Sequence, residues 1–180
     1  MGVTVLFLRG VNVGGAKLLP MAEFRLMLAD VGLQKVQTYL QSGNAVFVDP
    51  GEEGLEGRIA QAMQARFGFV AAQFLMPVAG LAQVLAGNPF QVAGQADGAR
   101  VHVVFLRGAV RFDADGLQKW AIAGERFHLS EAAFYLHTPD GFGRSKVAEK
   151  LGQYLKAEMT ARNQRSCEAV LALALGLTVS

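Results

Sequence analysis

The chain repeats itself, and this repeat limits the folds open to it more than any other feature of the sequence. Residues 3–10, an apolar and β-branched run that ends in Arg-Gly, return as residues 101–108 at an offset of 98. Further along, apolar positions match at a constant offset of 88, as Phe47 matches Tyr135. The first copy therefore holds ten residues that the second lacks, between its first and second strands. The two stretches that match, one at an offset of 98 and one at 88, follow the same order of elements, which indicates a duplication.

Apolar periodicity and turn residues predict the same elements in each copy. In the first copy we expect strands at 3–9, 36–40, from the turn at 41–44 through Val48, and at 70–75, with helices ending at Gly32 and Gly68 and a short helix beginning at Pro77. In the second we expect a strand at 101–106, a helix near 114–122, a hairpin at 126–137, a helix near 145–156 and a short strand near 158–161. A last helix follows, with Asn163 as its N-cap.

This order of elements is β-α-β-β-α-β in both copies, each with an appended helix. It predicts an α+β fold, a tandem duplication of a ferredoxin-like unit in which helices cover one face of each sheet. We place the first ferredoxin-like half at residues 1–90, a linker rich in Gly, Ala and Gln at 91–99, and the second half at 100–180.

Composition excludes several classes of protein. Hydrophobic residues make up 52% of the 180 residues and charged residues 18%, which indicates a folding chain rather than a disordered tail. The net charge of +2 is too small for a histone-like or membrane-coating role. A single cysteine, Cys167, cannot form an internal disulfide and favours a reducing compartment. No apolar run reaches the ~20 residues of a membrane span, and no basic region precedes the first apolar run. We expect a cytoplasmic protein without a membrane partner.

The extra residues of the first copy lie in or beside a glycine-rich segment, Gly10 to Lys17. Such a segment between a strand and a helix can wrap backbone N–H groups around an anion. It is not a P-loop, because Ala16 stands where the lysine belongs, and Asn12 replaces the second glycine of the dinucleotide fingerprint. The plain alternative is a long turn whose glycines only permit positive φ angles.

The two copies also differ at the start of their second helix. The first copy has Glu52, Glu53 and Glu56 there, the sign of charge that a helix N-terminus prefers. The second copy has Phe142-Gly143-Arg144-Ser145-Lys146, with Arg144 against Glu56. Cations at this end are unfavourable unless an anion binds there. The alternative is that both basic side chains extend into water.

A third basic segment runs from Thr160 to Arg165. Asn163 is explained as a helix cap, but Arg162 aligns with Phe74 of the first copy, so an apolar strand position has become cationic. Residues 144–165 hold six basic and two acidic side chains, a local charge of +4.

Other chemistry finds little support in the sequence. The three histidines, His102, His128 and His137, lie on expected strands without metal-binding spacing, so we expect no metal site. Cys167 falls on the apolar stripe of a helix and is expected in the core. Ser42 and Ser145 have no histidine at a predictable distance, and no G-x-S-x-G motif is present. Catalytic residues and cofactors are therefore left unassigned.

Several motifs together resemble those of the DUF1697 family, a bacterial group of about this length without an established activity. They are Leu-Arg-Gly-Val-Asn-Val-Gly-Gly at 8–15, Pro-Met-Ala-Glu-Phe-Arg at 20–25, Thr-Tyr-Leu-Gln-Ser-Gly-Asn-Ala-Val-Phe at 38–47, Gly-Arg-Ser-Lys at 143–146 and Thr-Ala-Arg-Asn at 160–163. The likeness covers nearly the whole chain, with departures at Ala45 and Ala161. The signature residues that match are polar, small or cationic: Arg9, Gly10, Asn12, Gly14, Gly15, Lys17, Ser42, Gly43, Asn44, Arg144, Ser145, Lys146, Arg162 and Asn163.

These residues lead to a functional hypothesis. We expect them to bind a small phosphate-bearing anion, a nucleotide in preference to a nucleic-acid strand, at the seam between the two halves, with arginines as bidentate clamps. One alternative is an enzyme on a phosphorylated or carboxylated metabolite, with Lys17 or Lys146 stabilising charge, although no general base is evident. Another is an oligomeric scaffold in which the signature residues only set loop geometry. The oligomeric state is left open.

Overall fold

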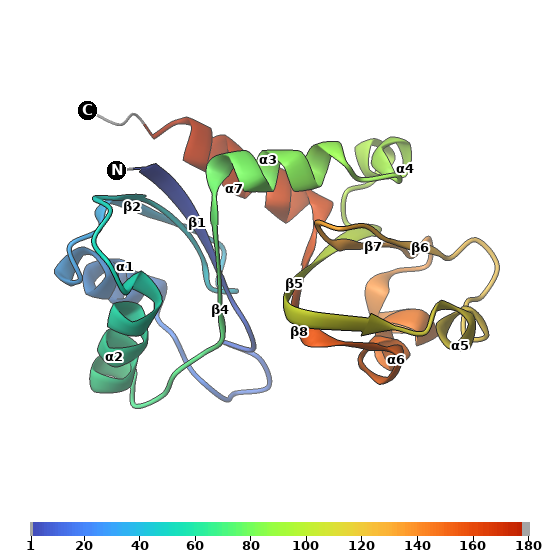
Figure 1. Cartoon of the computed structure of the whole chain (residues 1–180), viewed down its shortest axis with the longest axis horizontal. Helices are drawn as coiled ribbons and strands as arrows, with labels where there is room; N and C mark the ends of the chain where they lie inside the picture. The colour runs from blue at the N-terminus through green and yellow to red at the C-terminus, as the bar shows by residue number, and fades with distance from the viewer. Residues whose placement is uncertain (1, 178–180) are drawn as a thin grey trace. The chain divides into compact units, whose positions relative to one another are not determined.

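The computed structural model describes residues 2–177, which contain two four-stranded antiparallel sheets with helices (Figure 1). The first copy consists of β1 (Gly2–Leu8), α1 (Met21–Asp30), β2 (Gln34–Tyr39), β3 (Asn44–Asp49), α2 (Leu55–Phe67), β4 (Gln73–Pro77) and α3 (Val78–Ala86). A short helix, α4 (Gln91–Ala96), follows. The second copy consists of β5 (Val101–Phe112), α5 (Ala114–Gln118), β6 (Arg126–Leu129), β7 (Phe134–His137), a 3-10 turn (Phe142–Arg144), α6 (Lys146–Tyr154), β8 (Leu155–Asn163) and α7 (Gln164–Leu175).

Both sheets have the same topology. The strand orders are β2-β3-β1-β4 and β6-β7-β5-β8, so the first and third strands of each copy are central and the second and fourth are at the edges. Every pairing is antiparallel. This is the ferredoxin-like arrangement, and the predicted α+β duplication is confirmed.

The described residues group into two compact units. The first comprises the chain up to Ala82 together with the residues from Ala169 onward, and the second runs from Gln83 to Glu168. The interval expected as a linker, 91–99, contains helix α4. The division into 1–90, 91–99 and 100–180 as separately folding pieces stays a prediction. No helix among residues 2–177 is long and apolar enough to cross a membrane.

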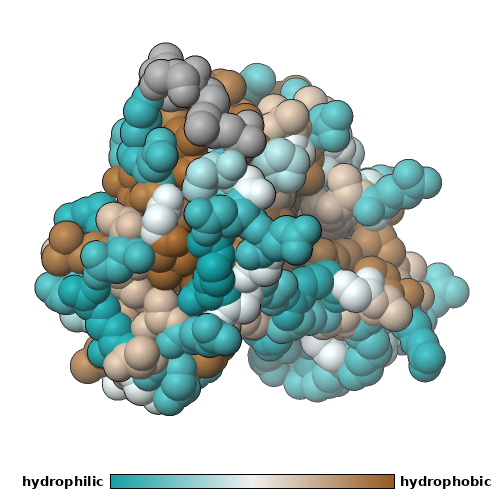
Figure 2. Space-filling view, turned by 60° about the vertical axis from the view of Figure 1, so that its left-hand side comes forward, coloured by the Kyte–Doolittle hydropathy of each residue, from teal (hydrophilic) through white to brown (hydrophobic). Residues whose placement is uncertain are grey.

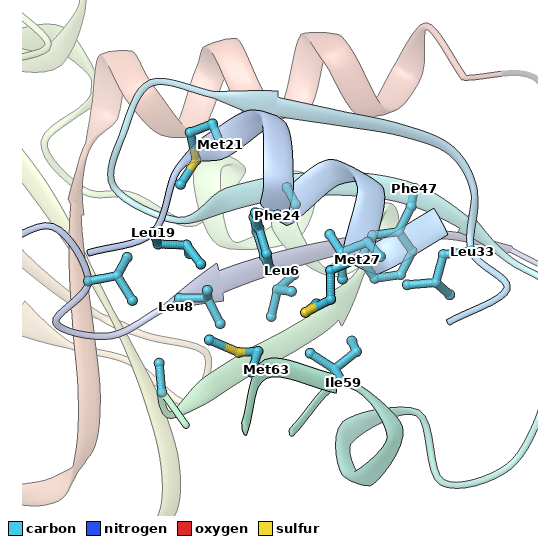
Figure 3. Close-up of a cluster of buried hydrophobic side chains, with 14 residues drawn as sticks. Leu6, Leu8, Leu19, Met21, Phe24, Met27, Leu33, Phe47, Ile59 and Met63 are labelled. Carbon is cyan, nitrogen blue, oxygen red and sulfur yellow. The ribbon is translucent and has the colours of Figure 1, made fainter. Parts of the chain in front are cut away.

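The core of the first unit lies between its sheet and helices α1 and α2 (Figure 3). Apolar residues spaced three and four apart, as in an amphipathic helix, bring one side of α1 onto β1 and β3. The buried side chains include Leu6 and Leu8 of β1, Phe24 and Met27 of α1, Phe47 of β3, and Ile59 and Met63 of α2. Helix α2 ends, as expected, at Gly68, whose φ of +75° suits a glycine.

The second unit has a corresponding core between its sheet and helices α5 and α6. It includes Val104 of β5, Phe134 and Leu136 of β7, Leu117 of α5, and Val147 and Leu151 of α6. Cys167 of α7 is fully buried, as expected for a core residue, and burial raises the pKa of its thiol to about 12. The thiol is therefore protonated at neutral pH and a poor nucleophile.

The register of the sheets corrects the alignment of the two copies. Thr4 pairs with Phe47, and its counterpart His102 pairs with Leu136, so β3 and β7 correspond at an offset of 89 (136 minus 47) rather than 88. Phe47 therefore matches Leu136 and not Tyr135. The offset of 88 holds for the helices, where Ile59 and Val147 are the equivalent core residues.

A larger correction concerns the last strands. Val5 pairs with Met76, and its counterpart Val103 pairs with Arg162, which gives an offset of 86. Arg162 thus corresponds to Met76 and not to Phe74. The alignment failed because turns of unequal length shift the strand register, and a gap-free comparison of sequences does not detect such shifts.

The lengths of some elements also differ from expectation. β5 continues from the expected 101–106 to Phe112, and β8 begins at Leu155 and ends at Asn163, because the two strands pair along their whole length beyond an irregularity between Arg107 and Arg111. Helix α5 is correspondingly short. β4 begins at Gln73 rather than at residue 70.

Candidate functional site

Three connections of the first unit meet at one end of its sheet. β1 ends where β3 and β4 begin, since Phe7 pairs with Asn44 and Leu8 pairs with Gln73. The connections 9–20, 40–43 and 68–72 therefore leave the sheet at the same edge. We call this region the loop end. It carries the signature residues of the first copy.

The glycine-rich segment forms an ordered turn at the loop end. Val13 bridges Ala16, and the Asn12 N–H donates to the Lys17 carbonyl over 3.2 Å. Gly14 and Gly15 occupy the tip with φ of +60° and +76°, and Gly10 precedes them at +67°. Two positive φ values at the tip are the requirement of a tight hairpin turn, which explains the glycine pair.

Asn12 fixes this turn to its neighbours. Its Nδ2 donates to the carbonyls of Leu19 and Gln41 over 3.0 and 2.6 Å, and its Oδ1 accepts from the Leu19 N–H over 2.7 Å. The side-chain amide is engaged at both ends, so Asn12 positions the turn against the β2–β3 connection. This is a structural role for one of the expected ligand residues.

Lys17 joins the turn to the third connection. Its Nζ donates to the Val70 carbonyl over 3.2 Å and lies 6.0 Å from the centre of the Phe69 ring. The ammonium group has three donors, so this bond leaves capacity for another acceptor at this exposed position.

The β2–β3 turn requires its glycine. Gly43 has a φ of +72°, and a Cβ there would lie 2.7 Å from Val11 Cγ2 and 2.8 Å from Leu8 Cβ. The buried Asn44 donates from Nδ2 to the Tyr39 carbonyl and to Ser42 Oγ. Gly43 and Asn44 therefore hold the turn, and the Ser42 hydroxyl oxygen accepts within it.

Arg9 differs from the other signature residues at the loop end. Its N–H donates to the Ala72 carbonyl over 3.0 Å, while its guanidinium is exposed and forms no hydrogen bond or ion pair with the residues that the structure describes. The counterpart in the second unit, Arg107, donates from Nε and Nη2 to Glu158 Oε2 over 2.7 and 2.6 Å. Arg107 pairs with Glu158 across the strands, whereas the residue opposite Arg9 is Ala72.

In the second unit, the Arg-Ser-Lys segment precedes α6, and its three residues have separate environments. Ser145 is buried and caps α6, since its Oγ accepts from the Ala148 N–H over 3.0 Å. Lys146 Nζ lies 2.6 Å from Glu149 Oε2, and hydrogen bonds from Lys146 and Lys150 lower the pKa of Glu149. The Arg144 guanidinium is exposed and has no hydrogen bond or ion pair within the described part of the chain.

Asn163 and Arg162 have different roles. Asn163 caps α7 as expected, because its Oδ1 accepts from the Ser166 N–H over 2.8 Å. Arg162 pairs with Val103, and the adjacent Val104 belongs to the core beneath α6, so alternation along the strand directs Arg162 to the opposite face. It donates to Thr160 Oγ1 and the Ala161 carbonyl, and burial lowers its pKa to about 10. The structure does not bring Arg162 onto the face that α6 covers.

Three of the basic residues in this part of the second unit form ion pairs. Of the basic residues counted at 144–165, Lys146 and Lys150 pair with Glu149, and Arg165 pairs with Asp97. Glu149 is already counted in the net charge of +4, so these ion pairs bring only one further carboxylate, Asp97, to the segment.

One residue that matters at the loop end, Ala72, was not identified from the sequence. Ala72 matters because it brings no carboxylate to Arg9 at the position where the second unit has Glu158 beside Arg107. The signal was present in the repeat, but the two-residue error in the alignment of the last strands concealed it.

His102 of β5 packs against an aromatic ring. His102 stacks on Phe142 with ring centres 4.2 Å apart, its Nδ1 is buried without a hydrogen-bond partner, and burial lowers its pKa to about 4. Among the described residues, no three His, Cys, Asp or Glu side chains lie together so as to hold a metal ion.

These features define a class, an α+β protein of two ferredoxin-like units in which the first unit has an enlarged, positively charged loop end. A family model described as a protein of unknown function, DUF1697, matches residues 1–135, and the chain belongs to this family. The chain is also similar to a solved structure of a conserved bacterial protein, SP0830, from Streptococcus pneumoniae. The two share 20% identity over 96% of this chain and 98% of that one, with a TM-score of 0.72, a likeness of fold. No curated protein matches the chain.

Proposed function

We propose that this protein binds a small phosphate-bearing anion, a nucleotide in preference to a nucleic-acid strand, at the loop end of the first unit. The observation that carries the proposal is the difference between Arg9 and Arg107. The same Leu-Arg-Gly sequence places an arginine at the end of each first strand, but only Arg107 has a carboxylate partner, Glu158. An exposed guanidinium without such a partner has its full set of donors available for phosphate.

The surroundings of Arg9 support the same ligand class. The connections 9–20, 40–43 and 68–72 contain Arg9 and Lys17 and no acidic residue, a net charge of +2. The bonds of Asn12 and the close packing at Gly43 hold these connections in one arrangement, which reduces the ordering cost of binding. Arg9 can bind two phosphate oxygens at once, and Lys17 can add a point charge.

The Arg-Ser-Lys segment is a second cationic element, and Arg144 is its available group. The expectation that it meets the loop end at the seam between the halves stays a prediction. A variant at Arg144 tests it separately from a variant at Arg9.

The experiment is calorimetry at low salt, where charged contacts are least screened, with ATP, pyrophosphate and a single-stranded oligonucleotide as probes. Arg9→Gln is expected to weaken binding of ATP and pyrophosphate by about tenfold or more, since a hydrogen bond to a charged group contributes about 1.5–3 kcal/mol. Arg111→Gln, at an exposed arginine of β5, is the matched control and is expected to leave affinity within about twofold.

Three outcomes would contradict the proposal: no binding of any probe, equal loss in Arg9→Gln and Arg111→Gln, or tighter binding of the oligonucleotide than of ATP per phosphate. The first would favour the scaffold alternative. A loss in Arg144→Gln equal to that in Arg9→Gln would extend the site to the second unit.

A further inference from the structure

One leucine at the loop end has a backbone conformation that side chains other than asparagine and aspartate seldom adopt. Leu40 opens the β2–β3 turn with a φ of +56°, and its side chain is 58% exposed. A left-handed residue with a Cβ costs stability, and glycine or asparagine is the usual choice at such a position. Because the side chain is mostly exposed, burial offsets little of this cost. Local structure therefore does not explain why the position holds leucine.

Other left-handed residues at the loop end have a local function. Asn12, at a φ of +55°, makes three hydrogen bonds through its amide, and Lys17, at +49°, donates to the Val70 carbonyl. The second unit connects β6 to β7 by a turn of the same length, 130–133, whose described residues Ser-Glu-Ala-Ala include no left-handed one. A turn of this length does not require a left-handed leucine. Strained residues of this kind cluster at ligand sites.

Leu40 is one of several apolar side chains exposed at the loop end. Val13 and Leu18 are each 67% exposed and Val70 is 43% exposed, and they lie in the connections 9–20 and 68–72. Figure 2, which brings the first unit forward, shows hydrophobic residues among hydrophilic ones on the surface of this unit. Exposed apolar side chains that are grouped, rather than scattered singly, are typical of a binding surface.

Two of these apolar residues adjoin Lys17, a cation of the proposed anion site. Leu18 follows it in the chain, and Lys17 Nζ donates to the Val70 carbonyl over 3.2 Å. A phosphate that the ammonium group holds therefore has aliphatic side chains nearby.

The turn that Leu40 opens is bonded to the strand end that carries Arg9. The Leu8 N–H, directly before Arg9, donates to the Gly43 carbonyl over 2.9 Å. The four-residue turn and the end of β1 are thus held side by side. A group esterified to a phosphate at Arg9 has the exposed leucine within the same small region.

We propose that Leu40 contacts the nucleoside part of the ligand and makes the loop end select nucleotides over bare phosphates and sugar phosphates. This inference rests on the anion site proposed above. The face of a nucleobase is apolar and packs against apolar side chains. The hydroxyl groups of a sugar phosphate would lose water at such side chains without gaining hydrogen bonds. Leu40 is thus a specificity residue, and Arg9 and Lys17 supply the charge.

The test is calorimetry at low salt with ATP and with tripolyphosphate, which has three phosphates and no nucleoside. ATP is expected to bind about fivefold more tightly or better, since contact with the base removes apolar surface from water. Leu40→Asn, with a residue that tolerates the left-handed backbone, is expected to weaken ATP about fivefold and to change tripolyphosphate by less than about twofold. Leu26→Asn is the matched control, at a leucine of α1 that is 53% exposed and outside the loop end, and is expected to leave ATP within about twofold.

Thermal unfolding separates this binding role from a structural one. Asparagine relieves the backbone strain at position 40, so Leu40→Asn is expected to keep or raise the Tm while it weakens ATP. A fall in Tm of more than about 3 °C would show that the leucine stabilises the fold, and would overturn the proposal.

The outcomes separate this inference from the anion site on which it rests. Equal affinity for ATP and tripolyphosphate, or an equal loss of both in Leu40→Asn, would overturn the role of Leu40 and leave the anion site in place. Absence of binding of both probes would overturn the anion site as well. A dimer of the native protein that Leu40→Asn dissociates would assign the leucine to an interface between copies, and would also overturn the proposal.

Discussion

Arg9 and Arg107 occupy equivalent positions at the ends of β1 and β5, within the same Leu-Arg-Gly sequence, but their environments differ. Arg107 is neutralised by Glu158 on the adjacent strand, whereas Arg9 lies opposite Ala72 and its guanidinium is exposed. The comparison shows that a duplicated scaffold holds the same arginine in two electrostatic environments: beside a carboxylate in one copy and beside an alanine in the other.

The connections near the two arginines also differ in length and in their acidic residues. In the first unit the chain takes twelve residues, 9–20, to reach α1, while the second unit takes seven, 107–113, to reach α5. The β2–β3 and β6–β7 turns are equal in length, at 40–43 and 130–133, and in the second the Ser130 N–H donates to the Ala133 carbonyl over 2.9 Å. The second unit carries Asp113 and Glu131 in these connections, and the first unit carries no acidic residue there. The additional length is held in place by Asn12 and Gly43.

The largest effect is expected at Gly43. Gly43→Ala adds a Cβ to a left-handed residue and directs it at Val11 and Leu8, so we expect a loss of about 2–4 kcal/mol of unfolding free energy. At the corresponding place ahead of β7 the second unit has the exposed Ala132, and Ala132→Gly is expected to cost no more than about 1 kcal/mol. Urea denaturation measures both. Equal losses of unfolding free energy in the two variants would mean that the two turns are packed alike.

Asn12 is expected to have the next largest effect. Asn12→Ala removes three hydrogen bonds and leaves a left-handed φ of +55° without the side chain that tolerates it, at a cost of about 2–3 kcal/mol. Asn12→Gly relieves the backbone strain and is expected to recover part of that loss. The same denaturation series measures it, and identical costs for the two variants would show that backbone strain plays no part.

His102 distinguishes the units by its response to pH, because its counterpart in β1 is Thr4. Burial lowers its pKa to about 4, so the folded state holds the neutral ring while the unfolded state takes up a proton near pH 6.5. Stability is therefore highest above pH 6.5 and falls by on the order of 2 kcal/mol as the pH drops to 4. His102→Thr is expected to make the dependence of unfolding free energy on pH shallower in this range. Burial also lowers the pKa of His137, so part of the dependence on pH is expected to remain in this variant.

The smallest effects on stability are expected from exchanging the partners of the two arginines. Ala72→Glu places a carboxylate opposite Arg9, and Glu158→Gln removes the ion pair of Arg107, each changing stability by about 1 kcal/mol or less because both sites are partly exposed. Ala72→Glu is nevertheless expected to weaken pyrophosphate binding about tenfold, while Glu158→Gln leaves it unchanged or adds a second, weaker site. Calorimetry measures both. Unaltered binding in Ala72→Glu would contradict the role assigned to Arg9.

The fold was predictable from the sequence because its main determinants are local. Apolar periodicity located the helices, the glycines at 32 and 68 marked their ends, and Asn163 was identified as a cap from its residue type and place. The repeated order of elements then defined the ferredoxin-like duplication, which the strand orders of both sheets confirm. Each of these signals depends on residues a few positions apart.

The candidate site was only partly predictable. The sequence singled out the loop-end residues, but it did not separate Asn12, Gly43 and Asn44, which hold the turns, from Arg9, which is exposed. That distinction depends on partners far along the chain, such as the Gln41 carbonyl, which lies twenty-nine residues from Asn12 in sequence and accepts its hydrogen bond.

By itself the sequence determined the elements, their order and the duplication, since each follows from side-chain spacing along the chain. Only the tertiary structure decided which residues face each other across the sheets. Hydrogen bonding between strands sets the register, and a shift of one or two residues changes both the face and the partner of every side chain. For this reason Glu158 appears beside Arg107, Ala72 beside Arg9, and Arg162 on the face away from α6, once the strands are paired.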